Sequence, residues 1–327
     1  MEATSPLYLK MKYVKLINYT EIENIYKLWN YSYGNIYPIS KELFKRNLSN
    51  ASFEHSYVVL ENEKLVGFII CKVWDEKFTI KDYSTCAWIS LMMVDPKYRL
   101  NGTGSTLLNL VETEMRELGK DELFLGKDYL NYFPGLPVDL KSSAGWFEKR
   151  GFIRPYDTYD LIKKVSFNSN DKLQLKNDKF EFRVCNLEDK ENLINFVKKN
   201  WPGRWEKETC DYFSNGGTGK EYVVALDDGL ICAFAKIGYP NTTEATMSYS
   251  LTWRNRFSAL GGIGPLGVDI SYRKRNLGYD IVAFANNILI DNNVSEIIID
   301  WTGLLDFYRR MNFEVFKSYF YMSKHLN

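Results

Sequence analysis

The sequence predicts an α/β protein built from two similar domains in tandem. Its 327 residues exceed the roughly 150 residues that one ordinary hydrophobic core accommodates. A short motif also occurs twice, and each copy lies between an apolar run typical of a strand and a pattern with helical periodicity. We expect a first domain over 1–166, a polar, Asn-rich linker over 167–177 and a second domain over 178–327.

The repeated motif is VDPKYRLNGTG at Val94 to Gly104 and VDISYRKRNLG at Val268 to Gly278. Val, Asp, Tyr, Arg and the final Gly coincide without a gap. Gly and Arg are common in turns, so a chance match is the alternative explanation. Five identities in register, with matching elements on both sides, favour a duplication.

The elements around the motif follow the same order in both halves. Each half opens with a strand, then an amphipathic helix and a hairpin with turn residues at its centre. After the motif come a helix, a short strand-like run and an aromatic-led helix that ends in a turn. The hairpins are expected at 57–72 and 222–236, the later strands from Glu122 and Glu296, and the last helices before Phe152 and Phe313.

Composition excludes several classes of function. Lys and Arg number 42 against 41 Asp and Glu, so no basic excess indicates a nucleic-acid partner. The five cysteines are dispersed and odd in number, which predicts reduced thiols rather than a disulfide framework. With only His55 and His325 present, we expect no metal site and no His-based catalytic triad. A secretion signal and a long apolar run are missing, so we expect a cytoplasmic protein away from membranes.

The motif has the composition of an anion site. A strand that ends in a glycine-bearing turn at a helix N-terminus presents unpaired backbone N–H groups and the positive end of the helix dipole. Gly102 and Gly104 allow a diphosphate to approach the backbone closely, and Arg99 adds a fixed positive charge.

The run from Arg99 to Gly104 is similar to the R/Q-x-x-G-x-G/A acetyl-CoA motif of the GCN5-related N-acetyltransferases (GNAT). The whole chain resembles tandem members of that superfamily, with a two-module layout similar to mycothiol synthase. The resemblance implies, in each half, a mixed and largely antiparallel central sheet flanked by helices, with the fourth and fifth strands splayed apart. It also implies acetyl-CoA as acyl donor, and direct attack on the thioester by a primary amine of a small molecule or peptide.

The resemblance assigns two sets of residues to acetyl-CoA. In the second copy Asn276 stands where the first glycine is expected, and Asn is the non-glycine residue that best tolerates left-handed backbone angles. Loss of the ligand from this half is the alternative. The two sets are Met93, Val94, Arg99, Leu100, Asn101, Gly102, Thr103, Gly104 and Ser105, and Gly267, Val268, Arg273, Lys274, Arg275, Asn276, Leu277, Gly278 and Tyr279.

The catalytic candidates lie in the second half. In the family a tyrosine on the last helix protonates the leaving thiolate, and Tyr308 occupies that position, four residues before the end of the helix. The corresponding residue of the first half is Phe147, which has no proton to donate, so we expect the C-terminal half to be catalytic. An ordinary half-buried aromatic is the alternative for Tyr308. Asp300 is a candidate general base or, equally, a helix N-cap.

Three further segments are candidates for the acceptor side. The aromatic stretch 127–137, which contains Asp128, either shapes a pocket or packs structurally. The NWPGRW stretch offers Trp201, Arg204 and Trp205, and the polar segment 241–262 could border the acceptor. Two other functions stay open, a non-catalytic acyl-CoA-binding or scaffold protein and an enzyme like the tRNA-dependent peptidoglycan aminoacyltransferases. We expect a monomer, with acetyl-CoA and an unidentified amine as its partners.

Overall fold

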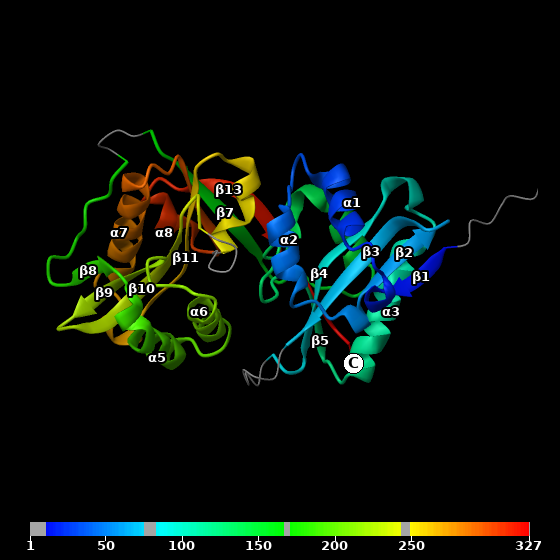
Figure 1. The fold of residues 1–327 in the computed structure, drawn as a ribbon, viewed down its shortest axis with the longest axis horizontal. Helices are drawn as coiled ribbons and strands as arrows, with labels where there is room; N and C mark the ends of the chain where they lie inside the picture. The colour runs from blue at the N-terminus through cyan, green and yellow to red at the C-terminus, as the bar shows by residue number, and fades with distance from the viewer. Residues whose placement is uncertain (1–10, 75–82, 167–170, 243–248, 327) are drawn as a thin grey trace, which may run out of the picture.

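The computed structural model describes residues 11–74, 83–166, 171–242 and 249–326. It has two lobes side by side, each with a β-sheet and flanking helices (Figure 1). The predicted α/β class with two tandem, mixed sheets is confirmed.

The first sheet has six strands in the order β1-β2-β3-β4-β5-β14. All of its neighbours are antiparallel except β4 and β5, which run parallel. The strands are β1 (Lys12–Lys15), β2 (Tyr57–Glu61), β3 (Lys64–Val73), β4 (Cys86–Val94), β5 (Glu122–Leu125) and β14 (Ser323–His325). The accompanying helices are α1 (Glu23–Tyr33), α2 (Lys41–Leu48), α3 (Thr103–Glu117) and α4 (Lys141–Glu148).

The second sheet has eight strands in the order β6-β13-β7-β12-β11-β10-β9-β8. Its β8 to β12 repeat the arrangement of β1 to β5, including the single parallel pair. The strands are β6 (Leu136–Pro137), β7 (Asp157–Lys164), β8 (Glu181–Val184), β9 (Tyr222–Asp227), β10 (Leu230–Gly238), β11 (Leu260–Val268), β12 (Glu296–Thr302) and β13 (Glu314–Phe320). Its helices are α5 (Lys190–Asn200), α6 (Arg204–Ser214), α7 (Leu277–Asp291) and α8 (Leu305–Arg309).

The two halves of the sequence exchange strands. β7 precedes the expected linker but lies in the second sheet between β12 and β13, and β14 at the end of the chain pairs with β5 of the first sheet. The C-terminus consequently lies beside α3 in the first lobe (Figure 1). Ion pairs from Lys324 to Glu112 of α3, at 2.6 and 2.7 Å, hold it there. Sheet membership therefore does not divide at the linker, and the boundaries 1–166, 167–177 and 178–327 stay a prediction.

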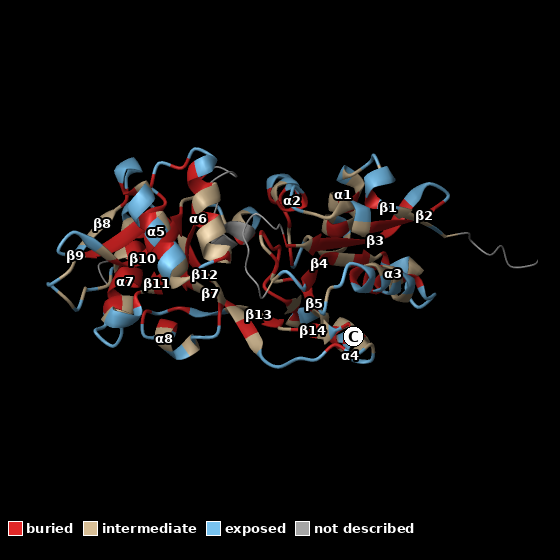
Figure 2. Ribbon diagram, turned by 90° about the horizontal axis from the view of Figure 1, so that it is seen from below, coloured by how far each residue is buried: buried red, intermediate tan, exposed pale blue. Residues whose placement is uncertain are grey.

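Buried residues, drawn red, are concentrated on the strands and on parts of the flanking helices (Figure 2). One hydrophobic cluster includes residues of both halves, because Trp29, Tyr37 and Phe133 pack together with Trp253 and Tyr319. The aromatic rings of this cluster join the lobes through a shared core.

The stretch 127–137 packs inside the protein. Tyr132 and Phe133 are buried, and Asp128 forms an ion pair with the buried Lys72 at 2.5 Å. Lys72 also donates to the carbonyls of Tyr129 and Leu130, which fixes the path of the segment. Asp128 is therefore occupied as a structural counter-ion.

The structure also bears on the expectations about cysteines, membrane spans, metal ligands and the segment 241–262. All five cysteines are free thiols, and four of them are buried. Within the described ranges, no helix is long and apolar enough to cross a bilayer, and no three His, Cys, Asp or Glu side chains group as metal ligands. Of the segment 241–262, residues 243–248 lie outside the described residues.

Candidate functional site

Each sheet opens at the end of its parallel strand pair. β4 and β5 pair from Cys86 to Ile89, and β11 and β12 pair from Leu260 to Ile263; both pairings stop there. β5 ends at this point, whereas β12 continues to Thr302 without pairing with β11, and a cavity lies at each opening.

The first-half cavity reaches the expected phosphate loop. It measures about 310 Å³, and five of the nine predicted residues line it, namely Met93, Val94, Arg99, Leu100 and Gly104. The other four, Asn101, Gly102, Thr103 and Ser105, lie in the same loop and in the first turn of α3. The remaining wall is largely apolar and includes Trp29, Phe133, Trp146 and Phe147.

The two expected phosphate loops have the same backbone conformation. The left-handed φ of 66° at Leu100 recurs as 63° at Lys274, and that of 81° at Gly102 recurs as 59° at Asn276. Both loops lead into helices of 15 residues. Asn276 therefore preserves the turn that glycine forms in the first copy, as its tolerance of left-handed angles predicts.

The two loops differ in the contacts and exposure of their positively charged side chains. In the first half Arg99 donates to the Val94 carbonyl at 2.8 Å and to the Tyr33 hydroxyl at 2.8 Å. In the second half Arg273, Lys274 and Arg275 are all exposed beside the N-terminus of α7. Three exposed cations at a helix N-terminus make an electrostatically favourable place for a diphosphate.

The second-half cavity contains both catalytic candidates. It measures about 600 Å³ and is lined by Asp300 and Tyr308 together with Trp201, Arg204 and Trp205. The predicted loop residues 273–279 do not line it. Its other walls are formed by Tyr83, Pro202, Ile263, Gly264, Pro265, Leu266, Ile299, Trp301, Thr302 and Leu304.

Asp300 leans across the opening between β11 and β12. A Cβ atom placed on Gly264 of β11 would lie 2.7 Å from Asp300 Oδ1, so the carboxylate occupies space that only a glycine leaves open. Burial raises the pKa of Asp300 to about 7, with a further rise from the charge of Asp160 and an opposing effect of Arg204. A carboxyl group with this pKa can accept a proton near neutral pH.

Tyr308, whose side chain ends in a hydroxyl group, lines the same cavity. Its side chain is buried on α8, and burial followed by the charge of Asp300 raises its pKa above the ordinary value. The hydroxyl therefore keeps its proton at neutral pH, as a general acid requires.

The first half has neither group at the corresponding positions. Following the strand register, Gly126 stands where Asp300 stands, because each is the residue after the last parallel pair. Phe147 corresponds to Tyr308, since both accept a hydrogen bond from the backbone of a following phenylalanine, at 3.2 and 3.3 Å. The adjoining rings, Trp146 and Phe307, pack edge-on at 4.9 and 4.8 Å in the same way.

Sequence reasoning missed part of the second cavity. Trp301 lines it directly after Asp300, and the Arg204 guanidinium lies 3.9 Å from the centre of its ring. Gly264 and Pro265 form the opposite strand wall. The sequence signal for this wall was a glycine followed by a proline inside an apolar strand pattern. Both residues weaken strand pairing and could have indicated the place where the strands open.

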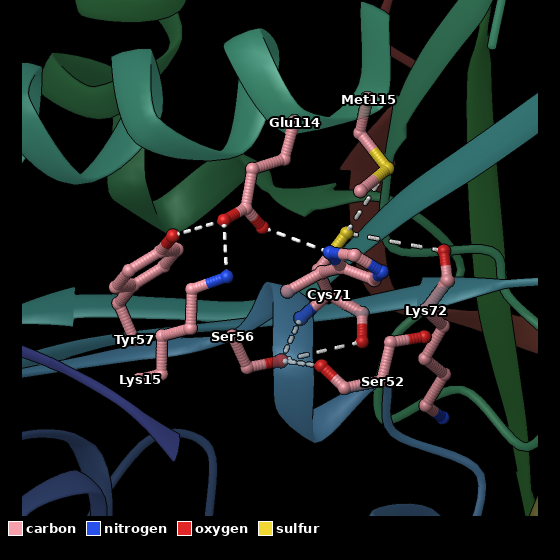
Figure 3. A network of polar contacts seen from close by, with 9 residues as sticks. Lys15, Ser52, Ser56, Tyr57, Cys71, Lys72, Glu114 and Met115 are labelled. Carbon is pink, nitrogen blue, oxygen red and sulfur yellow. Dashed lines mark hydrogen bonds and ion pairs between the residues drawn. The ribbon is translucent and has the colours of Figure 1, made fainter. Parts of the chain in front are cut away.

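A separate polar cluster surrounds Glu114 on α3 (Figure 3). Its carboxylate accepts from Lys15 at 2.7 Å, from His55 Nδ1 at 2.8 Å and from the Tyr57 hydroxyl. Burial opposes ionisation, but these contacts together lower the pKa of Glu114. None of the four residues lines either strand-opening cavity, so the cluster is a structural tie between β1, β2 and α3.

Comparisons with known proteins agree with this geometry. Residues 20–132 match the model of the Acetyltransferase (GNAT) family. No curated protein matches the sequence. Among solved structures, one described as a GCN5-related glucosamine N-acetyltransferase region of a fungal multi-domain GH3 beta-N-acetylglucosaminidase is 23% identical, with a TM-score of 0.83. The match covers 99% of this chain and 39% of that longer one.

Two further structures match over nearly their whole length. The GCN5-related N-acetyltransferase from Sphaerobacter thermophilus is 14% identical with a TM-score of 0.69, covering 97% of this chain and 96% of that one. A tandem GNAT protein from the clavulanic acid biosynthesis pathway is 12% identical with a TM-score of 0.67, covering 97% and 99%. Residues 20–132 thus match a GNAT family model, and the fold of the whole chain is similar to that of tandem GNAT proteins.

Proposed function

We propose that the protein is an acetyl-CoA-dependent N-acetyltransferase and that the transfer takes place in the C-terminal half. One observation carries the proposal: Asp300 and Tyr308 line a single cavity at the strand opening, whereas the first half has Gly126 and Phe147 at the corresponding positions.

The proposed reaction uses each group once. The diphosphate of acetyl-CoA binds at the loop 273–279, and the pantetheine arm lies between β11 and β12. The lone pair of the neutral acceptor amine attacks the thioester carbonyl carbon, and Asp300 removes a proton from the attacking nitrogen as the tetrahedral intermediate forms. As the tetrahedral intermediate collapses, the C–S bond breaks and Tyr308 transfers its proton to the leaving sulfur. The products are an amide and CoA, and a positioned acid of this kind contributes a factor of roughly 10² to 10⁴ in rate.

The first-half cavity has a different role in this proposal. It keeps both glycines of its phosphate loop and opens directly onto that loop, which suits binding of acyl-CoA. Because Gly126 and Phe147 stand at the positions of the proposed base and acid, we propose that this half binds or scaffolds and does not transfer.

The acceptor is a primary amine, and we propose an amino sugar as the first to be tested. Trp201, Trp205 and Trp301 line the cavity around Asp300, and aromatic faces can pack against the apolar face of a sugar ring. The similar structure described as a glucosamine N-acetyltransferase region supports the choice of glucosamine. A small amine or peptide without a sugar is the competing acceptor class.

The experiment compares CoA release from acetyl-CoA and glucosamine by wild type and by Tyr308→Phe. We expect the variant to lose roughly 10²-fold or more in turnover while its affinity for CoA is nearly unchanged. Tyr31→Phe makes the same chemical change at an exposed site of α1 and serves as control. Full turnover by Tyr308→Phe would overturn the assignment of the transfer to the C-terminal half. If wild type binds CoA but acetylates none of the amines tested, a binding protein would be favoured.

A further inference from the structure

β12 contains a bulge at the point where it enters the cavity. Ile299 pairs with Leu161 of β7 and Thr302 pairs with Tyr159, so two residues of β12, Asp300 and Trp301, face only Asp160. A bulge leaves the backbone of its extra residue without a ladder partner and turns its side chains away from the regular alternation.

The side chain of Asp160 takes the place of that ladder partner. Its Oδ1 accepts from the Trp301 backbone N–H at 3.1 Å. Its Oδ2 accepts from Trp253 Nε1 at 2.9 Å and from the Tyr319 hydroxyl at 2.6 Å. Asp160 is only 3% exposed, so three donors from three separate segments compensate a buried charge.

The bulge decides where two cavity residues point. Trp301 has a left-handed φ of 46°, and its ring stacks with Arg204 of α6. Asp300 is turned toward Gly264 across the strand opening. A tryptophan in the left-handed region is strained, and such a conformation persists only where surrounding contacts fix it.

We propose that Asp160 is a positioning residue for Asp300: its carboxylate fixes the bulge of β12 through the Trp301 N–H and places a negative charge beside Asp300. Calling Asp300 the base rests on the proposed function, whereas the effect of Asp160 on Asp300 does not. Because β7 precedes the expected linker, the first part of the sequence would complete a site in the second sheet.

Charged and titratable groups surround this carboxyl pair on every side. Asp300 is influenced by Arg204 and Glu208 of α6 and by Asp160 of β7, and it acts in turn on Tyr308 and Tyr319. Asp160 is faced by Tyr319 and Trp253 and lies within the field of Lys317, and its charge acts also on Tyr37. Burial raises the pKa of both carboxyls, and the three donors favour the charge on Asp160.

The test follows the titration of Asp300 directly, by carboxyl ¹³C NMR of aspartate-labelled protein, with the signal assigned through Asp300→Asn. In Asp160→Asn an oxygen remains for the Trp301 N–H but the charge is lost, so we expect the Asp300 midpoint to fall by roughly one pH unit. The acid limb of the kcat/KM profile should move by the same amount. Asp157→Asn makes the same change on β7 at a residue paired with Arg154, and should move neither.

Two more variants separate charge from position. Asp160→Ala also removes the oxygen, and we expect the Trp301 amide to exchange roughly tenfold faster than in Asp160→Asn. If Asp160→Asn does not fold, Tyr319→Phe tests the same effect, because loss of one hydrogen-bond donor disfavours the charged form of Asp160. The titration midpoint of Asp300 should then fall, but by less than the roughly one pH unit expected for Asp160→Asn. An unchanged Asp300 titration in the folded variants would overturn the proposal. Unchanged turnover in Asp300→Asn would instead overturn the proposed function, while the NMR titration still reports on Asp160.

Discussion

Replacing Asp300 by Asn should stabilise the protein while it removes activity. The folded protein holds the pKa of this carboxyl at about 7, against an ordinary value of 3.8, chiefly because the group is buried. Ionisation of Asp300 therefore costs more in the folded state than in the unfolded state. Asn is neutral at every pH and avoids that cost.

The size and the pH window of the effect follow from the two pKa values. Below about pH 4 the carboxyl is protonated in both states, so it contributes no difference. Between about 4 and 7 the unfolded state ionises first, and the penalty on the folded state grows until it is complete above about 7. Three pKa units correspond to at most about 4 kcal/mol, and solvent screening at this half-buried site reduces that to on the order of 2 kcal/mol.

Urea unfolding followed by tryptophan fluorescence at pH 8, 6 and 4.5 measures the effect. We expect Asp300→Asn to unfold at higher urea than wild type at pH 8, with a difference that shrinks toward pH 4.5. The same preparation should turn over roughly 10²-fold more slowly. A variant less stable than wild type at pH 8, or a difference that does not depend on pH, would refute this reading of the Asp300 environment.

Three other variants test the packing around the sites. Lys72→Met should leave Asp128 as an uncompensated buried charge and lower the free energy of unfolding by about 3 to 5 kcal/mol. The double variant Lys72→Met/Asp128→Leu should recover much of this loss, and no recovery would show that the broken ion pair is not its cause. Gly264→Ala should reduce turnover, because the added Cβ would lie 2.7 Å from Asp300 Oδ1 and the φ of Gly264 is 145°. Gly229→Ala, whose added Cβ would meet no atom within 4 Å, should leave turnover unchanged. Equal effects of the two substitutions on turnover would contradict the importance of this contact. Glu114→Gln should weaken the contacts of the side chain with Lys15, His55 and Tyr57 and lower the free energy of unfolding, measured in urea, by about 1.5 to 3 kcal/mol. An unchanged urea midpoint would count against a stabilising role of this cluster.

The elements around the repeated motif in each half could be predicted from the sequence because those signals are local. Alternation and helical periodicity gave the hairpins at 57–72 and 222–236, and the repeated motif gave the two helix starts. The left-handed turn at Asn276 also followed from its residue type.

Pairing between distant strands could not be predicted in this way. β7 and β14 were not among the expected strands, and nothing in their local sequence indicates which sheet each one joins. Asp160 was missed for the same reason: its role depends on a bulge in β12, which lies more than 130 residues later in the chain. Trp301 becomes a cavity residue only through that bulge.

The most direct test of the central claim places a negative charge in each phosphate loop in turn. Gly102 and Asn276 occupy the same left-handed position, and Asp tolerates that conformation, so Gly102→Asp and Asn276→Asp should both fold. Gly102→Asn is the neutral control for the first variant, and wild-type Asn276 is the neutral control for the second. In steady-state transfer from acetyl-CoA to glucosamine, we expect Asn276→Asp to lower kcat/KM for acetyl-CoA roughly tenfold or more through repulsion of the diphosphate, while Gly102→Asp matches Gly102→Asn. Loss through Gly102→Asp alone would place the transfer in the N-terminal half and contradict the account.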